Sequence, residues 1–178
     1  MLTGWLSRRR ERREAALSLY GAVVRQARSP AFYGVFGVDD TLDGRFDLIV
    51  LHAFLVLRRL RRQGDAAEAL AQALLDLMFA DFDRSLRELG VSDHSIGKRV
   101  KDMVKACYGR LAAYEQEFGP GADAGAALLR NVYRGDEARR AQAERLSAYL
   151  RRSAAAIEAQ PLPQILAGEP AFVRAEEH

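Results

Sequence analysis

The sequence predicts an all-α protein: a single-domain bundle of about six helices around a central apolar helix. Ala and Leu dominate the composition, and apolar residues recur every three or four positions, which is the helical period. A chain of 178 residues is about one domain long and can bury a core of its own. We expect a basic N-terminal arm over residues 1–16, a helical domain over 17–160, and an extended, partly docked C-terminal tail over 161–178.

The first helix is expected to run from about Ser7 to Arg28, because Pro30 and the residue before it disfavour its continuation. A short aromatic-rich connection, AFYGVFGVDDT, follows it. The residues expected on the apolar face of this helix are Leu17, Tyr20, Val24 and Ala27.

The second helix is expected to begin near Thr41, which can cap it, and to end at Gly64. Its apolar stretch over residues 48–57 contains one polar residue, His52, and is too short to cross a hydrocarbon core of roughly 30 Å. Because the helix is apolar nearly all round, burial at the centre of the bundle is favoured over a surface that receives another apolar segment.

Four further helices are expected. The third has a wide apolar arc and ends at the first glycine of ELGVSDHSIGKR, and the fourth begins within this stretch, capped by Ser92 or Ser95. After the break FGPGADAG come a short helix over about 126–133 and a longer one over about 136–158, and QPLPQILAGEPAF is expected to be extended. The stripe expected to face the core from the fourth helix is Ile96, Val100, Met103, Cys107, Leu111 and Tyr114.

The cysteine and charge content restricts the protein class. Cys107 is the one cysteine, which excludes an intramolecular disulfide and the usual cysteine-rich zinc patterns. The N-terminus has no apolar run typical of a signal peptide, so a cytoplasmic protein is expected, peripheral on the cytoplasmic face of the inner membrane at most. We expect no metal and no other cofactor.

Two polar residues on apolar helix faces are candidates for function. His52 is expected to be buried and neutral, and the alternative, a metal or haem ligand, needs a second ligand such as His94 or Cys107. Asp81 needs a charged or hydrogen-bonding partner, because an unpaired buried carboxylate costs several kcal/mol. Asp81 and Asp83 point away from each other on a helix, which argues against paired acid–base chemistry between them.

Basic groups at residues 8–13, 58–62 and 98–105 could neutralise RNA or lipid phosphates. The second group is equally explained by favourable charge at a helix C-terminus. No nucleic-acid motif accompanies these groups, so specific DNA binding is not expected. A basic helical module that binds RNA or the ribosome stays open as an alternative function.

Three stretches carry a resemblance to a known family: DTLDGRFDLIVLHAFLVLRRLR, LMFADFDRSLRELGVSDHSIGKRVKDMVKACYGRLAAY and AALLRNVYRG. On these stretches, the chain resembles the ubiquinol-cytochrome c chaperone family from about Leu17 to Tyr149. The resemblance implies an assembly factor without enzymatic activity, which binds newly made cytochrome b during biogenesis of the ubiquinol-cytochrome c reductase complex. The short N-terminus and the Arg-rich composition favour a bacterial member. Mitochondrial members also work with a small helical partner and at the ribosome.

Two candidate surfaces follow from these observations. A chaperone for a membrane subunit needs an apolar surface for its client. An N-terminal anchor at an anionic membrane surface would keep it near that client. The residues expected to bind the partner are His52, Asp81, Lys98, Phe32, Tyr33, Phe36, Arg58 and Arg62. The residues expected at the membrane surface are Trp5, Leu6, Arg8, Arg9 and Arg10.

Overall fold

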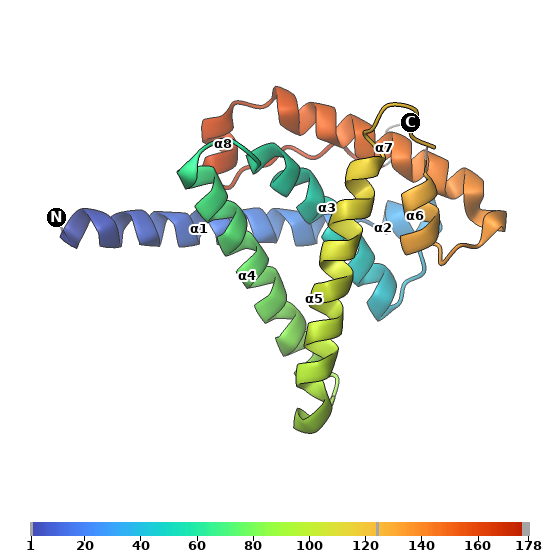
Figure 1. Cartoon of the computed structure of the whole chain (residues 1–178), viewed down its shortest axis with the longest axis horizontal. Helices are drawn as coiled ribbons and strands as arrows, with labels where there is room; N and C mark the ends of the chain where they lie inside the picture. The colour runs from blue at the N-terminus through green and yellow to red at the C-terminus, as the bar shows by residue number, and fades with distance from the viewer. Residues whose placement is uncertain (1, 124, 176–178) are drawn as a thin grey trace.

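The computed structural model describes the backbone of residues 2–123 and 125–175, and all side chains in these ranges except those of 2–6 and 93. This part of the chain forms eight α-helices and one short 3-10 helix and contains no strand, which confirms the all-α prediction (Figure 1). The elements are α1 (Leu2–Ala27), α2 (Pro30–Gly34), α3 (Leu42–Leu60), α4 (Asp65–Glu88), α5 (Asp93–Gln116), α6 (Ala126–Asn131), η1 (Glu137–Arg139), α7 (Arg140–Ala159) and α8 (Leu162–Leu166).

Helix α3 is the central element, as its apolar character predicts. It packs against α1, α4, α5 and α7, and most of its side chains are buried. The Thr41 hydroxyl caps its start by accepting a hydrogen bond from the Gly44 N–H at 3.1 Å. A side chain at Gly44 would meet the Asp39 carbonyl oxygen at 2.0 Å, so the capping turn requires glycine there. The helix ends at Leu60, four residues before the expected stop.

Helix α1 differs from its prediction in both length and orientation. It begins at Leu2 rather than near Ser7, so the boundary expected after residue 16 falls inside a continuous helix. Leu17, expected on the core face, is 49% exposed. Ala27 is buried as expected, and the rest of the buried stripe consists of Ala16, Leu19 and Val23, which recur at helical spacing. This stripe packs on α3 and α4.

The segment after α7 is not simply extended. Residues 162–166 form α8, and Ile165 is buried in the same core as the long helices. Ser18 on α1 donates a hydrogen bond to the carbonyl of Gly168 at 2.8 Å, and Gln26 donates one to the carbonyl of Val173 at 2.8 Å. These contacts place the C-terminal segment along α1.

Candidate functional site

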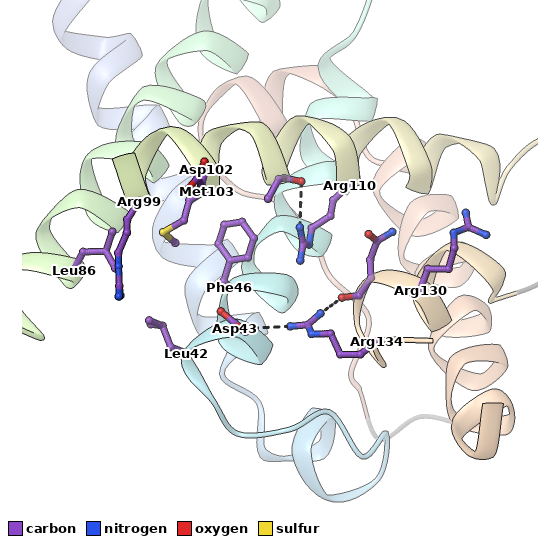
Figure 2. Close-up of a pocket in the computed structure, with 12 residues that line it drawn as sticks. Leu42, Asp43, Phe46, Leu86, Arg99, Asp102, Met103, Arg110, Arg130 and Arg134 are labelled. Atoms are coloured by element: carbon purple, nitrogen blue, oxygen red, sulfur yellow. Dashed lines mark hydrogen bonds and ion pairs between the residues drawn. The ribbon is translucent and has the colours of Figure 1, made fainter. Parts of the chain in front are cut away.

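An open groove lies where the first turns of α3 meet the α4–α5 hairpin and α6. It has a volume of about 440 Å³ and is lined by apolar side chains from three helices together with several arginines (Figure 2). Phe46 is almost buried, whereas Leu42 at the start of α3 is 44% exposed. The apolar lining residues are Leu42, Phe46, Leu86, Met103 and Ala106, and we call this site the Phe46 groove.

A second recess of about 270 Å³ continues the Phe46 groove toward α1 and α2. The two share Leu42, Phe46, Leu86 and Met103, so the apolar surface is continuous between them. Leu89, which is 63% exposed, adds a further apolar side chain at the end of α4. The α4–α5 hairpin thus presents one side to α3 and leaves part of the shared apolar surface accessible.

A buried ion cluster supports the wall of the Phe46 groove. Asp47, which directly follows Phe46, is fully buried, and its Oδ1 accepts a hydrogen bond from Arg110 Nε at 2.6 Å. Arg134 Nη2 lies 2.8 Å from Asp47 Oδ2. Burial raises the pKa of the Asp47 carboxyl, and the two guanidinium groups oppose that rise. The cluster ties α3 to α5 and to the turn after α6.

Each arginine of this cluster also shapes the groove. The Arg110 guanidinium lies over the Phe46 ring, 5.0 Å from its centroid, and so fixes the position of the ring. Arg134 has a left-handed backbone with φ of 57°, which is unfavourable for a residue with a side chain. Its guanidinium donates to the carbonyl of Asn131 and faces Asp43 at 4.0 Å (Figure 2).

Two further arginines at the groove have no ion-pair partner among the described residues. Arg99 on α5 and Arg130 on α6 are both exposed, and they lie on different sides of the apolar floor (Figure 2). Guanidinium groups bind carboxylates and carbonyl oxygens through a planar set of donors. The groove therefore combines an apolar floor with free donors at its edge, an arrangement suited to an apolar segment that carries acidic or carbonyl-rich ends.

The structure places three of the expected partner-binding residues in the core rather than at a surface. Phe32, Phe36 and His52 are buried around Tyr149, with 5.0 Å between the ring centroids of Phe32 and His52. Phe32 and Phe36 therefore do not belong to the exposed surface expected in the connection after α1, whereas Val35 is 38% exposed there. His52 is neutral: burial lowers its pKa to about 4.

Asp81 and Tyr33 lie beside the groove. The Asp81 side chain is 23% exposed and accepts a hydrogen bond from the Tyr20 hydroxyl at 2.6 Å, while Arg84 pairs with its other oxygen. The expected need for a charged or hydrogen-bonding partner is confirmed. Tyr33 lines the second recess together with Asp81. Lys98 is exposed on α5 and is not among the residues that line the groove.

The remaining predicted residues lie elsewhere. Arg58 pairs with Glu115 at 2.7 Å and lines a separate recess, and Arg62 is exposed in the turn after α3. Arg8, Arg9 and Arg10 are exposed on α1. The side chains of Trp5 and Leu6 lie outside the described residues. The expected sites are thus divided among the core, the groove, the end of α3 and the start of α1.

Sequence reasoning missed the principal groove residues. Asp47 carried a usable signal, since a carboxylate inside an almost wholly apolar helix requires a partner. Arg99, Arg110 and Arg130 carried none, because arginine is frequent throughout this chain. No group of His, Cys, Asp and Glu side chains suited to a metal ion occurs among the described residues. None of the helices in this part of the chain is long and apolar enough to span a membrane.

The fold and the groove define a single-domain helical protein with an arginine-edged apolar surface. Residues 35–172 match the ubiquinol-cytochrome C chaperone family, and the chain belongs to this family. A solved structure of the Cbp3 homolog from Brucella abortus is similar over 99% of both chains, with a TM-score of 0.86 and 32% sequence identity.

Curated relatives are more distant. The chain is 22% identical over 102 residues to ubiquinol-cytochrome c reductase complex assembly factor 1 from Mus musculus and to its counterpart from Xenopus laevis. The match covers 57% of this chain, but 35% of the mouse protein and 51% of the frog protein. The chain thus spans about a third to a half of the length of these relatives.

Proposed function

We propose that the protein is an assembly chaperone without enzymatic activity, which binds newly made cytochrome b during biogenesis of the ubiquinol-cytochrome c reductase complex. It acts in the cytoplasm or at the cytoplasmic face of the inner membrane. The proposal is supported by the family and by one structural observation: the partly exposed apolar floor of the Phe46 groove lies between Arg99 and Arg130, which are free of ion pairs within the described structure.

This arrangement matches the needs of an unassembled membrane subunit. A transmembrane segment outside its bilayer exposes apolar side chains that aggregate unless another apolar surface covers them. Its ends carry polar residues and unpaired backbone carbonyls, which guanidinium groups can bind. The groove thus covers part of a segment, and the two arginines orient it.

Affinity purification from the native membranes tests the proposal. The tagged protein is isolated at increasing salt concentration, and the eluate is assayed for cytochrome b by mass spectrometry and for ribosomal RNA. Retention of cytochrome b supports the proposal. Recovery of ribosomal RNA that is lost steeply with salt, without cytochrome b, contradicts it and supports the RNA-binding alternative.

A charge-reversal variant localises the contact. Arg99→Glu combined with Arg130→Glu is expected to weaken recovery of cytochrome b, because both changes place negative charge at the groove edge. Arg25→Glu combined with Arg145→Glu is the matched control, since both residues are exposed and neither lines the groove. Equal loss in both variants would show that the effect is one of net charge.

A further inference from the structure

The N-terminal part of α1 carries a concentrated basic surface that the proposed function does not use. Five arginines occupy six positions, at residues 8, 9, 10, 12 and 13, and all five are exposed. The helix continues through them without a break and projects beyond the other helices (Figure 1). The basic residues are therefore held on a regular scaffold.

The two acidic residues of this segment are bound within the helix. Glu11 accepts a hydrogen bond from the Ser7 hydroxyl at 2.6 Å, and Glu14 pairs with Arg10 at 2.8 Å. Arg8 and Arg12 lie one helical turn apart, and so do Arg9 and Arg13, so that the four side chains form two adjacent rows along the helix. No acidic residue lies between the two rows. One side of the helix is thus purely basic.

We infer that this side of α1 is a docking surface for anionic phospholipid. Arginines near a bilayer that contains acidic lipid each strengthen binding, and several together anchor a peripheral protein. Trp5 precedes Arg8 and Arg9 by three and four positions, the spacing of one helical turn, and Leu2 and Leu6 flank it in the sequence. Basic residues next to Trp and Leu are typical of helices that lie in a membrane interface, whereas RNA phosphates offer no site for aliphatic side chains.

The contacts of α1 with the rest of the bundle are compatible with lipid binding at its N-terminal part. Arg8, Arg9 and Arg12 line an open recess of about 1020 Å³ between α1, α4 and α8, and its charged lining also includes Glu11, Glu14 and Asp65. The core contacts of α1 come from residues 15–27. Binding at residues 8–13 therefore does not require the bundle to open, and it leaves the Phe46 groove free for a client.

Vesicle co-sedimentation of the full chain tests this inference. The probe is a vesicle of phosphatidylcholine alone or mixed with phosphatidylglycerol, at moderate salt. We expect binding to the anionic vesicles only, and a shift of the emission of Trp5, the one tryptophan of the chain, to shorter wavelength. Binding to both vesicles alike, or binding without an emission shift, would overturn the inference.

A triple variant and a matched control identify the surface. Arg8→Gln, Arg12→Gln and Arg13→Gln together are expected to weaken binding to anionic vesicles at least about tenfold. Arg25→Gln, Arg145→Gln and Arg174→Gln remove the same charge from exposed positions elsewhere and are expected to change it less than about twofold. Circular dichroism confirms that both variants fold. Equal loss in both, or binding of RNA at this face with no vesicle binding, contradicts the lipid assignment.

Discussion

Nε2 of His52 lies 2.9 Å from the hydroxyl of Tyr149, where α7 packs against α3 at the centre of the core. Nδ1 lies 2.7 Å from the carbonyl oxygen of Leu48, which can only accept, so Nδ1 carries the proton. Nε2 then accepts a hydrogen bond from the Tyr149 hydroxyl. Both ring nitrogens are satisfied by the neutral imidazole, and a second proton would displace Tyr149 from its donor role.

We expect the free energy of unfolding to fall between pH 6.5 and pH 4 because of His52. Its pKa is about 4 in the folded protein against 6.5 for a solvent-exposed histidine, so the unfolded chain binds the proton first as pH falls. The stabilisation is present above the unfolded pKa and is lost as pH falls, by about 3 kcal/mol at most. Urea unfolding at several pH values measures it. His52→Gln should reduce this slope, and an unchanged slope would contradict the assignment.

The Asp47 cluster makes Arg110 important for stability. Arg110→Met is expected to lower the free energy of unfolding by about 3 kcal/mol, because it leaves a buried carboxylate with one partner. Arg45→Met is the control: Arg45 pairs with Asp40, and both side chains are more than half exposed, so a loss below about 1 kcal/mol is expected. Denaturant unfolding compares them, and similar losses would exclude a special role for the cluster.

Gly168 allows the C-terminal segment to lie against α1. Its φ is 91°, and a Cβ there would come within 2.7 Å of the Ala15 carbonyl oxygen. Gly168→Ala is therefore expected to cost about 1–3 kcal/mol and to expose the segment after α8 to protease. Gly90→Ala has a comparable φ of 76° but no atom within 4 Å of the new Cβ, so it isolates the cost of the backbone conformation. Equal effects of the two changes would argue against close packing at Gly168.

The central helix could be predicted from local signals. Thr41 caps the start of this helix. Because the segment is apolar on every side, burial at the centre of the bundle exposes the least apolar surface to water. The start of α1 could not be predicted in the same way, because an arginine run has no apolar period. Arginine nevertheless favours helix, and the pair formed by Arg10 and Glu14 adds support at a spacing of four residues.

The candidate site was less predictable than the fold. The groove depends on the proximity of α3, α5 and α6, and the partners of Asp47 are Arg110 and Arg134, far along the chain. Sequence spacing within one helix cannot reveal such contacts. Phe32 and Phe36 were expected at the surface because they lie in a short connection between helices. Tertiary packing buries both side chains, and the local sequence does not show that packing.

The groove also predicts an effect in cells. Leu42→Asp is expected to lower cytochrome bc content toward the level found when the gene is deleted, because a carboxylate on the apolar surface weakens client binding by about tenfold or more. Aspartate in the first turn of α3 is compatible with the helix dipole, so the fold should be retained. Leu17→Asp is the control, since Leu17 is 49% exposed and lies on α1. Spectroscopic haem quantification of membranes compares the strains.

Site-specific photocrosslinking in growing cells tests the central claim most directly. A photoreactive amino acid is placed at position 42 or at position 17, where the native side chains are 44% and 49% exposed, and crosslinked products are identified by mass spectrometry. The account predicts that position 42 crosslinks to newly made cytochrome b and that position 17 does not. Crosslinks to cytochrome b from position 17 alone, or from neither position while the protein still supports reductase assembly, would contradict it.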